Sequence, residues 1–204
     1  ARRVGGRAGG GGMIPTMTAR PQTCVFIATS LDGFIARPDG RLDWLMQAQA
    51  AAPPGEDFGH AAFMAGIDAL VMGRKTLDTV RSFDPWPYAG IPVHALTRQP
   101  LADLPALGDL DVQWSRESPA ALLGRLSAAG VKRVYLDGGE LIQSFLREDL
   151  VDQLTVTTVP VLIGQGRRLW GELPADLRWA LQEVRHWDCG FLQTTHRRQR
   201  ADAA

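Results

Sequence analysis

Two short segments of the sequence combine glycine with residues that can bind an anion. The first, Met72–Thr76, joins an apolar run to a segment with helical spacing. A helix N-terminus presents unpaired N–H groups and the positive end of the helix dipole, which suit phosphate. Gly73 permits close backbone approach, Thr76 offers a hydroxyl, and Arg74 and Lys75 add positive charge. The alternative is a plain glycine turn before a solvated helix.

The second segment, Leu136–Glu140, also joins an apolar run to a helical one. Its paired glycines, Gly138 and Gly139, let the backbone approach a diphosphate, and the alternative is a flexible turn. The segment matches neither the Gly-x-Gly-x-x-Gly pattern of the common dinucleotide fold nor a Walker loop. In open sheets, ligands bind beyond the carboxyl ends of the strands, where both corners fall. The sequence therefore predicts that the two corners lie side by side and jointly hold one nucleotide diphosphate.

Three further residues could complete such a site. Arg98 follows the apolar run 91–97 and could hold a terminal 2′-phosphate by a bidentate contact, unless it is simply solvated. Asp32 lies in the glycine-containing segment 30–36, where a carboxylate acts as an acid, orients a substrate hydroxyl or caps a turn. Asp57 could act as an acid or complement a helix dipole. Partial burial would raise the pKa of such a carboxyl and allow proton donation.

The composition excludes several other functions. The 204 residues are 45% hydrophobic and 22% charged, which is typical of a folded domain. The 22 basic residues are balanced by 22 acidic ones, unlike the composition of a nucleic-acid-binding protein. Cys24 and Cys189 cannot form a disulfide framework or a thiolate zinc site, and the histidines lack ligand-like spacing. No apolar run reaches the ~18 residues of a membrane span. We expect a cytoplasmic protein without a metal and without nucleic-acid or membrane partners.

Strand-like and helix-like segments alternate along the middle of the chain. Strands are predicted over 23–30, 69–72, 91–97, 112–114, 134–136 and 152–163, helices over 57–66, 74–82, 119–129 and 140–147, and a terminal hairpin over 178–187 and 191–195. Segment 31–40, with its glycines and proline, is predicted to be a loop. This order predicts an α/β fold whose mixed, mainly parallel sheet ends in an antiparallel hairpin.

The two ends of the chain differ from its middle. Residues 1–21 are rich in glycine and arginine, and residues 197–204 are polar. Such segments bury too little apolar surface to fold, so we expect a disordered extension and a frayed tail around one domain, 22–196. Translation is expected to start at Met13 or Met17.

The order of four motifs resembles the reductase domain of riboflavin biosynthesis, a family that shares its fold with dihydrofolate reductase. These motifs are Ser30–Gly33, Met72–Thr76, Leu136–Glu140 and Val159–Gly164, and the resemblance covers roughly residues 22–196. The resemblance implies a three-layer α/β/α domain, NADPH as the hydride donor, a small-molecule substrate and commonly a homodimer.

The same resemblance implies where the cofactor lies. The segment from Gly73 to Thr76 would hold its phosphates and the 2′-phosphate side, with Thr97 and Arg98 nearby. Ala28 and Ile35 match positions that flank the nicotinamide in dihydrofolate reductases. The diphosphate would lie against a turn made of Gly138, Gly139, Glu140, Leu141 and Ile142.

Other residues would face the substrate. Trp44 resembles the tryptophan that closes a mobile loop over the nicotinamide, and Phe63 and Thr157 are further implied contacts. Asp32 matches the aspartate that faces the ribose of the riboflavin-pathway substrate. Asp57 lies sixteen residues before the first glycine corner, which matches the spacing of the folate-binding acid in bacterial dihydrofolate reductases.

Two departures from these families matter. The arginine that grips the glutamate tail of folate would fall near Ile91 and Pro92, where no arginine stands. The deaminase domain that often precedes the riboflavin reductase has no counterpart here, so a stand-alone reductase is expected. We therefore predict an NADPH-dependent reductase of a small heterocycle, with Asp32 or Asp57 supplying or positioning the proton. The alternatives are a dihydrofolate reductase and a non-catalytic NADPH-binding sensor or scaffold.

Overall fold

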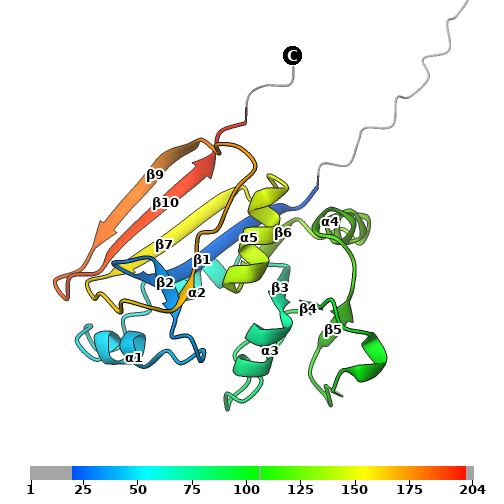
Figure 1. The fold of residues 1–204 in the computed structure, drawn as a ribbon, viewed down its shortest axis with the longest axis horizontal. Helices are drawn as coiled ribbons and strands as arrows, with labels where there is room; N and C mark the ends of the chain where they lie inside the picture. Colours follow the sequence, from blue (N-terminus) through cyan, green and yellow to red (C-terminus); the bar gives the residue numbers. More distant parts are fainter. Residues whose placement is uncertain (1–19, 106, 201–204) are drawn as a thin grey trace, which may run out of the picture.

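The sheet order places the two glycine corners on neighbouring strands. The computed structural model describes residues 20–105 and 107–200, with an eight-stranded sheet in the order β5-β4-β3-β6-β1-β7-β10-β9 (Figure 1). Its strands are β1 Gln22–Ser30, β3 Ala69–Gly73, β4 Val93–Leu96, β5 Val112–Ser115, β6 Arg133–Asp137, β7 Gln153–Val159, β9 Trp179–His186 and β10 Leu192–Arg198. The first six strands in this order, from β5 through β4, β3, β6 and β1 to β7, are parallel to one another. Strand β10 runs antiparallel to both β7 and β9. The predicted mixed sheet with a terminal hairpin is confirmed.

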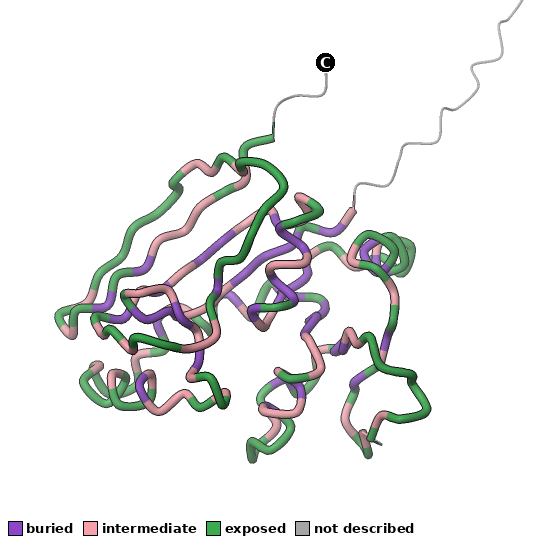
Figure 2. The backbone as a smooth tube through the Cα atoms, viewed as in Figure 1, coloured by how far each residue is buried: buried purple, intermediate pink, exposed green. Residues whose placement is uncertain are grey.

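Helices cover both faces of the sheet. They are α1 Asp43–Gln49, α2 His60–Met64, α3 Arg74–Val80, α4 Pro119–Ala128 and α5 Gly139–Arg147, with a 3-10 turn at Leu101–Asp103. Side chains of β6 alternate between the faces, because Val134 and Leu136 pack in the cluster of α4 and α5, whereas Tyr135 packs in that of α2 and α3. Buried residues therefore run through the inner strands, whereas β9 is mostly exposed (Figure 2). The three-layer α/β/α architecture is confirmed.

One segment predicted to be a loop contains a strand. β2 Phe34–Ala36 pairs with β8 Arg167–Arg168 in a separate two-stranded sheet. Phe34 and Ala36 are 5% and 7% exposed. Their burial therefore stabilises the strand despite the low strand propensity of the glycines in this segment. Helix α1, which follows, was not predicted from the sequence either. Trp44 of α1 packs in a third apolar cluster with Phe58, Val159 and Phe191.

Two predicted elements end earlier or begin later in the structure. The strand predicted over 152–163 ends as β7 at Val159, because Pro160 has no N–H to donate to a ladder. The helix predicted over 57–66 contains α2 only from His60. Phe58, with a φ of 55°, separates the helix from Asp57.

Charged side chains close the sheet at the amino ends of β1 and β7. Asp152 Oδ2 lies 2.7 Å from Arg20 Nη1, and Asp152 Oδ1 lies 2.6 Å from Arg200 Nη1. Asp149 accepts from Arg198 at 2.7 Å and pairs with Arg200 at 3.3 Å. We call these five residues the amino-end network. Because β10 runs to Arg198 and Arg200 is paired, the ordered chain extends beyond the expected domain limit; residues 1–19 and 201–204, where the remaining predictions for the ends fall, lie outside the described residues.

Candidate active site

The two glycine corners meet at the carboxyl edge of the sheet. Met72 and Asp137 are register partners on β3 and β6, so the residues after them, Gly73 and Gly138, follow adjacent strand ends. A Cβ atom placed on Gly138 would collide with the Oγ1 atom of Thr76. The predicted juxtaposition of the corners is therefore confirmed.

Backbone crowding at the second corner leaves no room for side chains. Gly138 has a φ of 98°, which favours glycine, and a Cβ on Gly139 would lie 2.8 Å from Ile35 Cδ1 and 3.1 Å from the Arg168 carbonyl. No side chain among the described residues caps α5, so the N–H groups of its first turn are available to an anion. This cradle fits the diphosphate of a dinucleotide. Leu141 and Ile142 are buried in the core, so only their backbone could contribute.

The first corner contributes side chains rather than a helix terminus. Helix α3 has only seven residues, and Arg74 Nη1 donates to Asp78 Oδ2 at 2.7 Å. Lys75 Nζ donates across the corners to Glu140 Oε1 at 2.6 Å. The Lys75 hydrogen bond holds the pKa of Glu140 below its ordinary value, and the Arg98 charge acts in the same direction.

Thr97 and Arg98 follow β4 at the same edge. The Thr97 N–H donates to the Ser115 carbonyl at 2.9 Å, and the Thr97 hydroxyl accepts from the Gln99 N–H at 3.1 Å. Arg98 is exposed, and no carboxylate among the described residues pairs with it. Its guanidinium is available to an anionic ligand.

Asp32 joins the loop after β1 to the loop after β7. Its carboxylate accepts from the Ser30 hydroxyl at 2.6 Å and from the N–H groups of Gly164 at 2.8 Å and Ile163 at 3.2 Å. The hydrogen bond from Ser30, followed by those from the two N–H groups, holds the pKa of Asp32 below its ordinary value. An ionised Asp32 can position a substrate hydroxyl but is a poor proton donor.

An open hollow lies beside this junction. It has a volume of about 450 Å³ and is lined by Ile163, by Gln165 and by the segment after β2. Within that segment Arg37 Nε donates to Asp43 Oδ1 at 3.1 Å. The hollow is large enough for a small heterocycle.

Asp57 is exposed, and its hydrogen bonds are to the segment that leads into α2 rather than to either glycine corner. Its two carboxylate oxygens accept from the N–H groups of Gly59 and Ala61, each at 2.8 Å. These hydrogen bonds, that from Ala61 first, lower the pKa of Asp57. The geometry favours the alternative considered from the sequence, in which Asp57 complements the start of a helix.

The structure instead brings an unexpected carboxyl to the site. Asp137 ends β6 directly before Gly138, on the face of the sheet that carries Tyr135. The Tyr88 hydroxyl donates to Asp137 Oδ2 at 3.3 Å. Burial raises the pKa of Asp137 from 3.8 to about 6, and the hydrogen bonds from Tyr88 and from the Gly138 N–H oppose that rise. A carboxyl with this pKa is suited to proton donation near neutral pH.

The residues expected to contact the substrate or nicotinamide are mostly buried. Trp44 is 2% exposed, and its Nε1 atom has no hydrogen-bond partner among the described residues. Phe63 is 7% exposed and packs edge-on against Tyr135. Thr157 is 4% exposed, and its hydroxyl accepts from the Gln193 amide at 2.9 Å. Ala28 is half-buried against the third cluster. None of these contacts involves the two corners.

Two further features bear on the class of site. The described part of the chain contains no helix with the length and apolar character needed to cross a bilayer. Within the same residues, no group of three or more histidine, cysteine or acidic side chains is placed to hold a metal ion.

Comparison with known proteins identifies the family. The family model for the RibD C-terminal domain matches residues 21–193. The uncharacterized protein YwjB of Bacillus subtilis is 30% identical over 168 residues, which cover 81% of this chain and 92% of YwjB. A crystal structure of a putative riboflavin biosynthesis protein from Shewanella sp. PV-4 is 40% identical, with a TM-score of 0.80 and coverage of 88% of this chain and 99% of that one.

A more distant structure agrees with the fold alone. The Thermotoga maritima diaminohydroxyphosphoribosylaminopyrimidine deaminase/5-amino-6-(5-phosphoribosylamino)uracil reductase is 15% identical, with a TM-score of 0.65. The match covers 88% of this chain and 57% of that one. On the family match, the relative and the closely similar Shewanella structure, the chain belongs to the RibD C-terminal domain family, the reductase domain of riboflavin biosynthesis.

Proposed function

We propose that this protein is an NADPH-dependent reductase that delivers a hydride to a small heterocycle. The observation that carries the proposal is the meeting of Gly73 and Gly138 on adjacent strand ends, with Thr76 against Gly138. Such a paired corner at the carboxyl edge of a sheet suits a nucleotide diphosphate.

The cofactor would be held mainly by backbone and by small polar groups. Gly138 and Gly139 would lie against the diphosphate, with Lys75 and the Thr76 hydroxyl beside it. Ile35, which lies against Gly139, would contact the nicotinamide side. Bound NADPH would supply the hydride, and the chain would supply orientation and the proton.

Asp137 is the proposed proton donor. With a pKa of about 6, roughly a tenth of its carboxyl groups carry a proton at pH 7. Oδ2 accepts from the Tyr88 hydroxyl, so the proton would reside on Oδ1 and move from there to the atom of the substrate that gains negative charge. Tyr88 would hold the carboxyl in this orientation.

Asp32 would position the substrate rather than protonate it. Its carboxylate accepts three hydrogen bonds from Ser30, Ile163 and Gly164, and a carboxylate has about four acceptor positions. The remaining position could accept a substrate hydroxyl at the rim of the hollow beside Ile163.

The similarity to riboflavin-pathway reductases favours a pyrimidine substrate. The named activity of the Thermotoga maritima relative is the reduction of 5-amino-6-(5-phosphoribosylamino)uracil. For this chain we propose that compound or a related pyrimidine carrying a hydroxylated substituent, because the ionised Asp32 accepts from the N–H of Ile163, which lines a hollow of suitable size.

Cofactor binding can be tested at the crowded glycine. Gly138→Ala is expected to abolish NADPH binding in a fluorescence titration, because the new Cβ would displace Thr76 and fill the cradle. Gly130→Ala is the matched control, since Gly130 also has a positive φ, 86°, but has no atom within 4 Å of the added Cβ. Equal NADPH affinity in both variants would contradict the proposed diphosphate site.

Turnover distinguishes the reductase from the alternatives. NADPH oxidation is expected when 5-amino-6-(5-phosphoribosylamino)uracil is added and not when dihydrofolate is added. Turnover of dihydrofolate alone would identify a dihydrofolate reductase instead. Tight NADPH binding without oxidation in the presence of either compound would favour the sensor or scaffold.

A further inference from the structure

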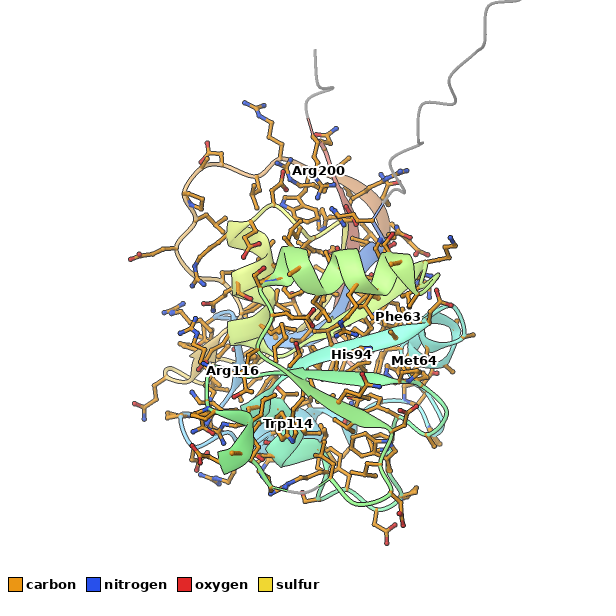
Figure 3. All side chains as sticks on the ribbon, turned by 90° about the vertical axis from the view of Figure 1, so that its right-hand side faces the viewer. Phe63, Met64, His94, Trp114, Arg116 and Arg200 are labelled. Carbon is orange, nitrogen blue, oxygen red and sulfur yellow. The ribbon has the colours of Figure 1, made fainter. Side chains whose placement is uncertain are left out.

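A second hollow lies on the face of the sheet that α2 covers, away from the glycine corners. It has a volume of about 210 Å³ and is lined by residues of β1, β7, β10, β9 and α2 and by Arg133 of β6. Arg133 and Gln153 are the first residues of β6 and β7, whereas Gly138 follows the last residue of β6. Figure 3 shows Phe63 of this hollow on the right, whereas Arg116, which follows the carboxyl end of β5, lies on the left. The hollow is therefore separate from the proposed cofactor site.

Three neighbouring strands supply the floor of this hollow. Phe26 of β1 and Thr195 of β10 are both register partners of Thr155 on β7, so the three side chains share one face of the sheet. The hydroxyl oxygens of Thr155 and Thr195 lie 3.1 Å apart and form a hydrogen bond. Gln193 lies two residues before Thr195 on the same face, and Thr155 and Gln193 are only 5% and 4% exposed. The floor is therefore polar although it is largely removed from water.

The side chain of Gln193 has one acceptor atom without a donor. Its Nε2 atom donates to the Phe58 carbonyl at 3.0 Å and to the Thr157 hydroxyl at 2.9 Å, and these two acceptors fix the orientation of the amide. In that orientation Oε1 accepts no hydrogen bond from any residue that the structure describes. An acceptor withdrawn from bulk water destabilises the fold unless a donor reaches it. Because Gln193 lines the hollow, a ligand bound there can supply that donor.

Arg133 brings a positive charge that no carboxylate balances. Its guanidinium carbon lies 5.5 Å from the centroid of the Phe63 ring, and Nε donates to Cys24 Sγ at 3.2 Å. Its backbone N–H, rather than its side chain, donates to Asp68 at 2.8 Å. Among residues 20–105 and 107–200, this half-buried guanidinium has no ion pair. Its terminal nitrogens are therefore available to an anion in the hollow.

We propose that this hollow binds a small aromatic carboxylate that also carries a hydroxyl group. The carboxylate would bind the guanidinium of Arg133, because the other two charged side chains of the hollow, Glu183 and Arg185, already pair with each other at 2.7 Å. The hydroxyl would donate to Gln193 Oε1. The site is independent of the proposed reductase function.

The apolar wall of the hollow favours an aromatic ring over an aliphatic acid. The ring centroids of Phe26 and Phe63 lie 4.9 Å apart, and Phe26 is only half-buried. A ligand ring packed against Phe26 would cover apolar surface that the fold leaves open. The volume of about 210 Å³ suits a ligand with a single ring rather than a dinucleotide.

Isothermal titration calorimetry with 4-hydroxybenzoate tests the proposal. The wild type is expected to bind this probe. 4-Hydroxybenzamide, which lacks the negative charge, should bind about tenfold more weakly or worse, and benzoate, which lacks the hydroxyl, at least about threefold more weakly. Changing the probe replaces a substitution of Gln193, whose two donated hydrogen bonds also stabilise the fold.

Substitutions of Arg133 locate the site. Arg133→Met should weaken 4-hydroxybenzoate binding by about tenfold or more and remove the preference for the acid over its amide, while methionine keeps an apolar contact with Phe63. Arg133→Lys should lie between Arg133→Met and the wild type, because lysine keeps the charge but not the planar fork. An unchanged circular dichroism spectrum shows that each variant is folded, and if Arg133→Met does not fold, Arg133→Lys decides.

Arg147→Met is the matched control. Arg147 is an exposed arginine in the last turn of α5, which packs on the opposite face of the sheet. This variant should bind 4-hydroxybenzoate as the wild type does.

Three results would overturn the site: no binding of 4-hydroxybenzoate by the wild type, equal affinity for the acid and its amide, or wild-type affinity in both Arg133 variants. None of these results bears on the proposed function, because the hollow lies apart from the glycine corners. Conversely, failure of the wild type to bind NADPH would overturn the proposed function and leave this site standing.

Discussion

The two edges of the central sheet differ in whether their charged side chains are paired with opposite charges. At the amino edge, Asp152 accepts from two arginines and from the Thr23 N–H at 2.9 Å, and Asp149 is similarly paired. At the carboxyl edge, the described residues give the desolvated carboxyl of Asp137 a tyrosine and no cation as its side-chain partner, and they give Arg98 no carboxylate. Groups that could neutralise one another are kept apart there.

The difference separates residues that stabilise the fold from residues that await a ligand. Matched charges at the amino edge stabilise the folded state in the absence of any partner. Unmatched charges and a desolvated carboxyl cost stability until a ligand supplies the missing interactions. Substitutions at the two edges should therefore change stability and binding in opposite directions.

Asp137→Asn should produce the largest effect. Loss of the proton donor is expected to lower turnover by about 10²- to 10⁴-fold in NADPH-oxidation assays. The same variant should be more stable at pH 7, by at most about 3 kcal/mol, because it removes a buried charge. Urea denaturation measures that gain. Loss of stability together with unchanged turnover would contradict the role given to Asp137.

Asp152→Ala should break the amino edge without affecting the site. Removing the carboxylate leaves Arg20 without its ion pair and the Thr23 N–H without its acceptor, whereas Arg200 keeps Asp149, so the free energy of unfolding should fall by about 3 kcal/mol. The affinity for NADPH should not change. Asp39→Ala serves as the control, because Asp39 pairs with Arg41 at the surface, where such pairs contribute at most about 1 kcal/mol. Similar losses of stability in the two variants would show that the amino-end network stabilises the fold no more than an ordinary surface ion pair does.

The pH dependence of stability should differ in sign between the edges. The folded-state pKa of Asp137, about 6, lies above the ordinary value of 3.8, so the folded protein binds more protons and stability rises as the pH falls through 6. Between pH 7 and pH 5 the gain should be about 1 kcal/mol. Burial raises the pKa of Asp152, but hydrogen bonds from Arg20, Thr23 and Arg200 outweigh it and lower the net value. Its contribution is therefore complete above about pH 4 and is lost below it.

Denaturation midpoints measured at several pH values would separate the contribution of Asp137 to stability from that of Asp152. Asp137→Asn should abolish the rise between pH 7 and pH 5, and Asp152→Ala should flatten the fall below pH 4. Tyr88→Phe should move the pKa of Asp137 further up, because the Tyr88 hydrogen bond lowers it. The pH at which turnover increases should then shift in the alkaline direction.

Glu140→Gln should have the smallest effect. The ion pair with Lys75 is exposed, with 79% of the Glu140 side chain accessible, so stability should change by less than about 0.5 kcal/mol. Releasing Lys75 towards the diphosphate should tighten NADPH binding by about threefold at low salt, an effect of screened surface charge. Weaker binding would mean that Lys75 does not face the cofactor.

The sequence predicts the parts of the fold that depend on local pattern. Both glycine corners lie where an apolar run meets helical spacing, and the parallel order of the strands then brings the corners together. Ser118 and Pro119 likewise begin α4 as their types indicate, with the Ser118 hydroxyl accepting from the Ala121 N–H at 3.3 Å.

The remaining features depend on contacts between distant segments. β2 forms only because β8, more than a hundred residues later, pairs with it. Asp137 is visible in the sequence before its two glycines, but its pKa depends on burial and on Tyr88, 49 residues earlier. No local pattern reveals either partner. Asp57 shows the converse, because its place in the sequence matches a known acid, whereas its contacts are those of a turn.

The amino-end network has a further consequence for how this fold can be joined to other polypeptides. One carboxylate, that of Asp152, binds both Arg20 and Arg200, so the two ends of the described chain leave the sheet together. In Figure 1 they emerge at the top, whereas α1 and α3 lie at the bottom. A partner domain or affinity tag joined directly at Arg20 or Arg200 would therefore lie away from the carboxyl edge of the sheet. A short linker between the ends would permit circular permutation, with new termini opened in a distant surface loop.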